Sequence, residues 1–269
     1  MGIDDRLTRA GGPAVSGFLV SATAAWSKTL GHSLSGVYIH GSLATDAFNP
    51  RTSDIDVVVA TRVLTDAATN RQLRDLQLQM LGWGDERWAE RLEVVYAPAR
   101  ALTTREVPAV SVLELHPDEG FKVAPLGPEF LIQRYLLRTS GITLFGRDVT
   151  KLVPQITTGE LRAAQIGALR EWWLPQLEFP GRFLDRAYQA YAVLTMCRAL
   201  CLLTLGKVVT KPDAAAWALR GAYLEPWRSL IRSAVAYPGG RQTDQRGATI
   251  DFIRFALEEA GIGHEAPSS

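Results

Sequence analysis

The stretch HGSLATDAFNPRTSDIDVVVAT, residues 40–61, places a Gly-Ser pair and an Asp-Ile-Asp triplet at the ends of two apolar runs. The first run, GVYIH at 36–40, is short and apolar as in a buried strand, and Gly41-Ser42 ends it. The segment 46–53 is rich in turn residues and leads into the second run at 54–61. We therefore predict two buried strands joined by a polar loop.

Asp54 and Asp56 are the first candidates for chemistry. In a strand the side chains of residues i and i+2 point to the same face, so the two carboxylates project together. Two ionised carboxylates side by side repel one another unless a cation lies between them. Magnesium is the hard cation that such an oxygen pair usually binds, and it commonly takes substrate phosphates as further ligands. The pair predicts a magnesium site, although Asp-x-Asp alone is a common pattern.

Two further features strengthen this interpretation. Gly41-Ser42 ends the preceding predicted strand, where free backbone N–H groups and a hydroxyl can approach a phosphate closely. Glu93 adds a third carboxylate on another predicted strand, 92–97, where a lone Glu is costly to bury without a partner. Singly, a Gly-Ser pair is usually a turn and a Glu at a strand start is usually exposed. The three carboxylates in order on successive strands favour a functional site.

The rest of the chain divides into a mixed first half and a helical second half. In the first half, the apolar periodicity predicts a further strand over 111–115 and helices over 5–30, 64–88 and 128–139. A stretch of Gly, Pro, Asp and Thr at 146–158 marks a boundary. Beyond it we predict a disordered tail after Gly261 and helices over 158–175, 183–205, 213–221, 224–236 and 243–260.

The composition is typical of a globular protein without strong charge bias. Of the 269 residues, 47% are hydrophobic and 21% charged, which excludes a disordered chain. Lys and Arg number 29 against 28 Asp and Glu, and neither half is a basic block, which argues against a nucleic-acid partner. No uninterrupted apolar run reaches the ~18–20 residues of a membrane span, and the start lacks a secretory signal. We expect a cytoplasmic protein with no membrane partner.

Other residues with chemical potential are given structural roles. Cys197 and Cys201 lie four apart on a predicted helix with no histidine spaced for zinc, so we expect buried, inert thiols. Trp172 and Trp173 are expected in a core or an interface. The segment Asp118-Glu119 is expected in a solvated loop where an acceptor pocket could be lined. The histidines form no metal or catalytic pattern: His32, His40 (a core residue at a strand end), His116 and His264.

The first motif resembles a known superfamily. HGSLATDAFNPRTSDIDVVV looks like the Gly-Ser-x(n)-Asp-x-Asp signature of the DNA polymerase beta-type nucleotidyltransferases. The resemblance extends towards the streptomycin/spectinomycin (aminoglycoside) adenylyltransferases through RLEVVYAP, LTMCRAL, GKVVTKPDAAAWAL and AVAYPGG. It implies an α/β (α+β) nucleotidyltransferase domain with a small mixed sheet, residues 1–156, followed by an all-α helical-bundle domain, residues 157–269.

The resemblance also implies an activity and its residues. That family transfers AMP from ATP–magnesium to a hydroxyl of an aminoglycoside or aminocyclitol, which confers antibiotic resistance. Carried over by position, Ser42 and Ser53 would hold the triphosphate, and Asp54 and Asp56 two magnesium ions. Glu93 would be the general base on the acceptor hydroxyl.

From the helical half, Arg198 and Lys211 would reach the phosphates across a cleft between the domains, and Tyr237 would line its nucleotide side. For Arg198 there is independent support, because it interrupts an apolar stripe at helical spacing and is therefore expected to face inward. The stripe consists of Ala187, Tyr191, Leu194, Arg198, Cys201 and Leu205. A structural salt bridge would explain Arg198 equally well, and Lys211 alone would be an ordinary surface lysine.

The acceptor stays open. Family members that accept streptomycin use a tryptophan in the middle section and acids before the arginine-bearing helix. Here no tryptophan occurs between Trp88 and Trp172, and the acids of the later region thin to Glu178 and Asp185. A polycationic drug needs carboxylates to replace its water, so streptomycin is disfavoured and spectinomycin or another hydroxylated acceptor remains. The alternatives are transfer to a biosynthetic sugar or a protein side chain, or a non-catalytic nucleotide-binding or toxin–antitoxin module. We expect a monomer.

Overall fold

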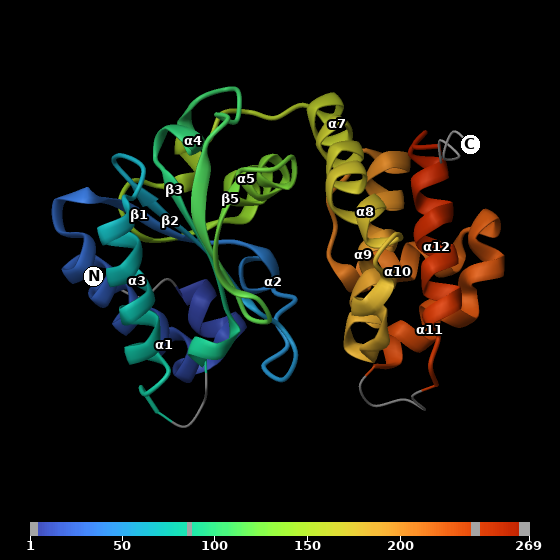
Figure 1. Ribbon diagram of the computed structural model, residues 1–269, viewed down its shortest axis with the longest axis horizontal. Helices are drawn as coiled ribbons and strands as arrows, with labels where there is room; N and C mark the ends of the chain where they lie inside the picture. Colours follow the sequence, from blue (N-terminus) through green and yellow to red (C-terminus); the bar gives the residue numbers. More distant parts are fainter. Residues whose placement is uncertain (1–4, 85–87, 238–242, 264–269) are drawn as a thin grey trace. The chain divides into compact units, whose positions relative to one another are not determined.

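The chain folds into two compact units in the computed structural model, which describes residues 5–84, 88–237 and 243–263 (Figure 1). The first unit contains the residues up to Leu126 together with Gln133–Gln155. The second contains Gly127–Ile132 and the residues from Ile156 onward. The short segment Gly127–Ile132 therefore groups with the second unit although it precedes the last strand of the first.

A six-stranded sheet forms the centre of the first unit, with the strand order β5-β4-β3-β2-β1-β6. β2 and β3 run parallel, and the other neighbouring pairs are antiparallel. This small mixed sheet confirms the predicted fold class. The strands are β1 (Leu34–Ile39), β2 (Ile55–Thr61), β3 (Leu92–Pro98), β4 (Ser111–His116), β5 (Gly120–Pro125) and β6 (Ile142–Phe145).

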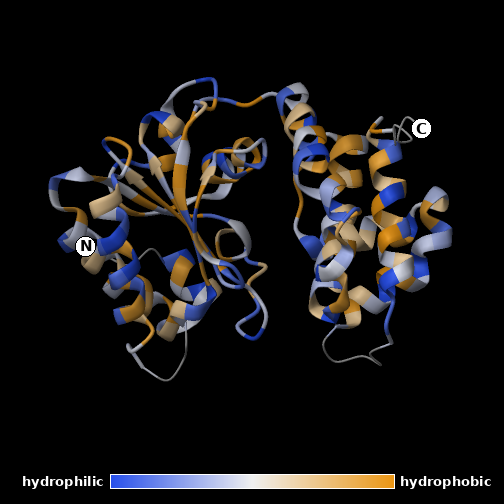
Figure 2. Ribbon diagram, in the orientation of Figure 1, coloured by the Kyte–Doolittle hydropathy of each residue, from blue (hydrophilic) through white to orange (hydrophobic). Residues whose placement is uncertain are grey.

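One face of the sheet forms the hydrophobic core of the first unit. Alternate residues of the central strands, such as Val57 and Val94, pack in one cluster with residues of α1 (Asp5–Leu30) and α3 (Ala67–Met80). Figure 2 shows the strands of this sheet mainly in the hydrophobic colour. Because successive side chains in a strand point to opposite faces, the intervening residues lie on the face away from α1 and α3.

The helices of the first unit differ from the prediction in extent. The helix over 5–30 is present, with a break at Gly12 (φ 74°), which precedes a proline that cannot continue the hydrogen-bond ladder. The helix predicted over 64–88 is shorter: Asp66 caps α3 by accepting a bond from the Thr69 N–H (2.7 Å), and α3 ends at Met80. The remaining helical segments of this unit are η1 (Gly31–Ser33), α2 (Gly41–Ala44), η2 (Trp88–Arg91), α4 (Arg100–Thr103) and α6 (Val149–Leu152). α5 (Glu129–Ser140) begins in the segment that groups with the second unit and continues into the first.

Strands β5 and β6 were not predicted from the sequence. They lie at the two edges of the sheet, where a strand pairs on one side only. β5 contains no fully buried residue, and β6, although its burial alternates, is only four residues long, which is too short for a sequence pattern to detect. β5 pairs with β4 and β6 pairs with β1 through backbone hydrogen bonds. These bonds do not require a particular pattern of side chains.

The second unit is a helical bundle around α9 (Arg186–Leu205). The predicted start near Thr158 is confirmed: Thr157 and Glu160 form a reciprocal capping box on the first helix. Gly206, in a left-handed conformation (φ 66°), ends α9 as predicted. The other elements are α7 (Thr158–Ala168), η3 (Leu169–Trp173), α8 (Leu174–Gln176), η4 (Pro180–Leu184), α10 (Lys211–Arg220), η5 (Ala222–Trp227), α11 (Arg228–Ala236) and α12 (Arg246–Glu259).

α9 is long and apolar enough to cross a membrane by length and composition alone. In the structure it is the central helix of the bundle, with α7, α10, α11 and α12 packed against it. Half of its most apolar window is buried. A core helix of a folded domain passes the same test, so the packing explains its hydropathy. The predicted disordered tail falls mainly on residues 264–269, which lie outside the described residues.

Candidate active site

Asp56 and Glu93 occupy paired positions on the parallel strands β2 and β3. Paired residues of neighbouring strands lie about 5 Å apart and project to the same face, here the face away from the core helices. Both side chains are half-buried, and Asp54, which lies just before β2, is exposed. By strand alternation Asp54 projects to the same face as Asp56. The structure therefore brings the three carboxylates predicted from the sequence to one side of two adjacent strands.

Gly41 lies directly against the Asp56 carboxyl group. Its backbone has a positive φ of 65°, and a Cβ at this position would come within 2.6 Å of Asp56 Cγ. His40 N–H donates to the carbonyl of Asp56 (3.1 Å), which fixes the end of β1 beside β2. Only glycine meets both the conformation and the space, and the chain then turns so that half-buried Ser42 follows in α2. The Gly-Ser pair thus lies beside the metal-binding candidates, as predicted.

Arg91 holds the loop that carries Ser53. Its guanidinium donates to the carbonyls of Asn49 (3.3 Å), Pro50 and Ser53. It also lies over the rings of two aromatic side chains, Phe48 at 5.8 Å and Trp88 at 5.2 Å. Burial lowers the pKa of Arg91, and the nearby negative charge of Asp54 opposes this shift. Arg91 was not predicted as a site residue, because a single Arg before a strand forms no sequence pattern.

Ser53 takes part in the same loop. Its hydroxyl oxygen accepts a hydrogen bond from the Asn49 N–H (2.9 Å), so this oxygen helps to shape the turn. Because the hydroxyl oxygen acts as an acceptor in this bond, the hydroxyl hydrogen of Ser53 can still be donated to another group. The structure places Ser53 next to Asp54 and half-buried, which suits the predicted contact with a phosphate.

His116 and Glu114 extend the acidic face onto β4. His116 Nδ1 lies 3.8 Å from Glu93 Oε1, and its Nε2 lies 3.2 Å from Glu114 Oε2. The hydrogen bond with Glu114 is the main cause of a raised pKa of His116; burial and the charge of Lys122 oppose it, and Glu93 reinforces it. His116 was not predicted as a site residue, because the four histidines of the chain form no metal or catalytic pattern. His116 lies two residues after Glu114, so the two side chains share a face of β4. This spacing could have identified His116, but the predicted strand ended one residue before it.

The donor chemistry of this face suits magnesium. Among the described residues no group of three or more His, Cys, Asp or Glu side chains could hold a metal ion. Magnesium bound with a nucleotide needs fewer protein ligands, because waters and phosphate oxygens complete its octahedron. Asp54 and Asp56 supply the one or two carboxylates of such a site. The two cysteines are not alternatives: both are buried, and burial raises the pKa of Cys197 to about 12.

The predicted inward stripe of α9 is wrong. Its members Ala187, Tyr191 and Leu205 are exposed, and Arg198 is half-buried. The fully buried residues, such as Val193 and Cys197, lie on other faces of the helix. α9 is apolar nearly all round because four helices cover it, so spacing alone does not identify its core face. Arg198 instead shares the least covered face of α9 with Tyr191.

Lys211 lies on that same face of the bundle. Its Nζ is 4.4 Å from the centre of the Tyr191 ring, and its position at the start of α10 follows the cap residue Thr210. Tyr191 in turn stacks on Trp173 (6.1 Å between ring centres), which is buried as predicted. Trp172 is 39% exposed and lies under the guanidinium of Arg182 at 5.2 Å. The predicted core role is therefore confirmed for Trp173 alone.

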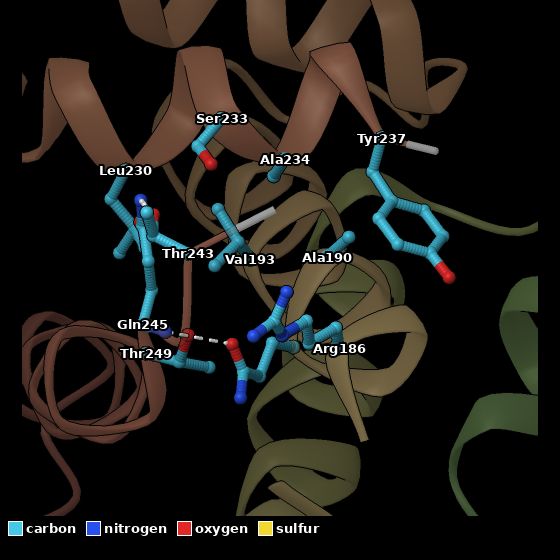
Figure 3. Close-up of a pocket in the computed structure, with 11 residues that line it drawn as sticks. Arg186, Ala190, Val193, Leu230, Ser233, Ala234, Tyr237, Thr243, Gln245 and Thr249 are labelled. Carbon is cyan, nitrogen blue, oxygen red and sulfur yellow. Dashed lines mark hydrogen bonds between the residues drawn. The ribbon is translucent and has the colours of Figure 1, made fainter. Parts of the chain in front are cut away.

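Tyr237 directly follows α11 and is half-buried. It lines a small cavity of about 30 Å³ together with residues of α9, α11 and α12, and in Figure 3 its hydroxyl points away from the other labelled side chains. The cavity has room for about one water molecule, far below a nucleotide. The rest of the AVAYPGG motif falls on residues 238–240, outside the described residues. The cavity is lined by Arg186, Gln189, Ala190, Val193, Leu230, Ser233, Ala234, Tyr237, Thr243, Gln245 and Thr249.

Comparisons with known proteins agree with this architecture. Residues 155–256 match the family model of the aminoglycoside adenylyltransferase C-terminal domain. Among solved structures, the chain is similar to the crystal structure of spectinomycin adenyltransferase AAD(9) from Enterococcus faecialis with ATP and spectinomycin. The TM-score is 0.70 at 17% identity, and the match covers 90% of this chain and 98% of that chain. A search of curated proteins finds no match.

The two similarities carry different weight. The structural likeness, at 17% identity, shows a shared fold along nearly the whole chain. The family match assigns the helical region, residues 155–256, to the C-terminal domain family of the aminoglycoside adenylyltransferases. Together they confirm the predicted family resemblance and the predicted enzyme class, a nucleotidyltransferase.

Proposed function

Because the helical region belongs to this domain family, we propose that the protein transfers AMP from ATP to a hydroxyl of an aminoglycoside or aminocyclitol. The observation that carries the proposal is the register of Asp56 with Glu93 on parallel strands. This pairing sets the proposed metal-binding carboxylate and a second carboxylate side by side, on the face opposite the core cluster formed with α1 and α3.

Glu93 is the base in this reaction. The Glu93 carboxylate takes the proton of the acceptor hydroxyl, whose oxygen then attacks the α-phosphorus of ATP. A new bond forms between the acceptor oxygen and the α-phosphorus, while the bond from that phosphorus to the bridging oxygen of the β-phosphate breaks. Pyrophosphate leaves with the electron pair, and the acceptor keeps AMP as an ester. Partial exposure of Glu93, 31% of its side chain, lets the carboxylate reach an acceptor.

Asp54 and Asp56 hold the magnesium that accompanies ATP, with two ions expected. When bound, this metal neutralises charge on the phosphates. Ser42 and Ser53 donate hydroxyl hydrogen bonds to the triphosphate from both sides of the Asp pair. Gly41 keeps the space beside Asp56 open, because any side chain there would displace the carboxylate.

Arg198 and Lys211 supply positive charge for the triphosphate from the helical unit. Both side chains are half-buried on the face of the bundle that carries Tyr191, and Lys211 lies over the Tyr191 ring. Guanidinium and ammonium groups are the usual protein donors to phosphate oxygens. Tyr237 is assigned to the nucleotide on the resemblance alone, because the small cavity beside it fits no base.

Spectinomycin is the acceptor we propose to test first. The structural neighbour is named for it. This chain has no tryptophan between Trp88 and Trp172, and the acids before α9 thin to Glu178 and Asp185. The turn at Asp118-Glu119 connects β4 to β5 next to His116, where it can add exposed carboxylates for an acceptor ammonium. Streptomycin is expected to be a poor substrate.

A screen of acceptors tests the proposal. ATP and magnesium are incubated with spectinomycin, streptomycin and other aminoglycosides, and mass spectrometry detects the AMP adduct while pyrophosphate release gives the rate. We expect an adduct with spectinomycin that Glu93→Gln abolishes or strongly reduces. Glu106→Gln removes an exposed carboxylate outside the site and serves as the matched control. ATP binding without an adduct on any of these acceptors would contradict the proposal and favour a sugar or protein acceptor, or a non-catalytic module.

A further inference from the structure

His116 lies between two carboxylates of very different exposure. The Glu114 side chain is 11% exposed, that of His116 is 26%, and that of Glu93 is 31%. The three therefore form a chain from the interior of the sheet to its accessible face. The buried end is anchored by a hydrogen bond from His116 Nε2 to Glu114 Oε2 at 3.2 Å.

The two neighbouring carboxylates favour the protonated form of the imidazole. In a neutral histidine that donates from Nε2 to Glu114, the lone pair of Nδ1 would face the Glu93 carboxylate, which is 3.8 Å away. Two lone pairs directed at one another repel, whereas a protonated Nδ1 attracts the carboxylate. With a carboxylate at each nitrogen, the doubly protonated form is favoured on both sides of the ring.

We propose that His116 is a positioning residue that holds the Glu93 carboxylate towards the acceptor hydroxyl, with Glu114 fixing the imidazole ring. This inference rests on the proposed role of Glu93 as base. It gives the site a cation on the side of Glu93 opposite Asp56, whose like charge lies in register on β2 and repels the Glu93 carboxylate. Without His116 the Glu93 side chain is expected to rotate away from Asp56 and from the acceptor.

A second cation, Lys122, lies near His116. On β5, Lys122 is paired with Glu114 in the strand register, and its ammonium is bound by Glu119 at 3.0 Å. That ion pair turns the Lys122 charge towards the β4–β5 turn. On β3 the next residue of the same face is Val95, which is apolar and buried. His116 Nδ1 lies 3.8 Å from Glu93 Oε1, on the side of β3 away from β2.

A double-mutant cycle between His116 and Glu93 tests the inference. With ATP, magnesium and spectinomycin, His116→Asn is expected to lower kcat about tenfold, because a misplaced catalytic group costs rate without weakening binding. KM for both substrates should stay within about twofold. In the Glu93→Gln background, His116→Asn should cause no further loss, since the group it positions is already gone.

Two further variants control the experiment. Glu114→Gln keeps the imidazole but weakens its anchor, so it should lower kcat in the same direction by a smaller factor, and it serves if His116→Asn does not fold. His32→Asn changes an exposed histidine of η1 and should match the wild type. Wild-type kcat in His116→Asn, a change confined to KM, or an equal loss in the Glu93→Gln background would each overturn the inference. Full activity of Glu93→Gln alone would instead refute the proposed base.

Discussion

The backbone of Gly41 lies so close to the carboxyl group of Asp56 that a methyl group on Gly41 would come within 2.6 Å of Asp56 Cγ. Asp56 also stands in register with Glu93 on the neighbouring parallel strand. The glycine of the first motif therefore sets the position of a carboxylate of the second. The Gly-Ser pair and the Asp-x-Asp triplet, which are separated along the sequence, are therefore in direct contact in the folded protein.

Substitution of Gly41 is expected to damage activity more than stability. Gly41→Ala forces a Cβ into a left-handed conformation, which costs roughly 1–2 kcal/mol, and it displaces the Asp56 carboxylate as well. Gly31→Ala is the matched control, because Gly31 has φ 51° and open space around its Cβ position. Both variants should lose similar stability in urea unfolding, and Gly41→Ala alone should lose most of its turnover. Comparable turnover in the two variants would contradict the role of the contact.

Asp54→Asn and Asp56→Asn are each expected to abolish turnover and to leave the fold intact. Each substitution removes a ligand of the bound metal while keeping the size of the side chain. Removing one of several neighbouring carboxylates also relieves repulsion, so the melting temperature without ligands should be unchanged or higher. Pyrophosphate release and thermal unfolding measure the two effects. Near wild-type turnover in either variant would show that its carboxylate does not bind the metal.

Arg91→Ala is expected to loosen the loop that carries Ser53. It removes hydrogen bonds to three carbonyl groups and the contacts with two aromatic rings, a loss on the order of 1–3 kcal/mol in urea unfolding. Arg91→Lys should recover little, because an ammonium cannot reproduce the fork of the guanidinium. KM for ATP should rise in both variants. Arg51→Ala changes an exposed arginine of the same loop and should behave as the wild type; an effect as large there would argue against a specific clamp.

The pKa of His116 is expected to lie above its ordinary value of 6.5, mainly because of the hydrogen bond with Glu114. A raised folded-state pKa gives stability that is fully present below the unfolded value and is lost as pH rises through the folded value. The difference in unfolding free energy between the wild type and His116→Asn should therefore shrink with rising pH above about 6.5. An NMR titration of the assigned His116 resonance checks the shift directly, and Glu114→Gln should lower it. A His116 pKa at or below 6.5 would be the opposite result.

Arg198→Ala and Lys211→Ala are each expected to weaken ATP–magnesium binding by roughly 1.5–3 kcal/mol, the scale of a hydrogen bond to a charged group. The double substitution need not be additive, because both groups would bind one triphosphate. Isothermal titration calorimetry measures the affinities, with the exposed Lys207→Ala as control. Unchanged affinity in both single variants would leave the helical unit with a role for the acceptor alone.

The sequence alone determined the local elements of the site. GVYIH and DIDVVVAT are apolar runs bounded by turn residues, so β1 and β2 follow from burial and alternation within a few residues. The same alternation predicted that Asp54 and Asp56 share a face. Start and stop signals act within one turn of helix, so the start of α7 at Thr158 and the end of α9 before Gly206 were predicted from the sequence.

Only the tertiary structure decided which distant residues meet. The partners of Glu93 depend on strand order and register, which arise from backbone pairing and leave no pattern in the side chains. This pairing places Asp56 on one side of Glu93 and His116 on the other. The edge strands β5 and β6 were missed for the same reason. The core face of α9 was misjudged because four neighbouring helices cover an apolar helix on nearly all sides, and packing then chooses which face stays open. A residue's own neighbours along the chain determine its local conformation, but its chemistry at the site depends on contacts that exist only once the chain has folded.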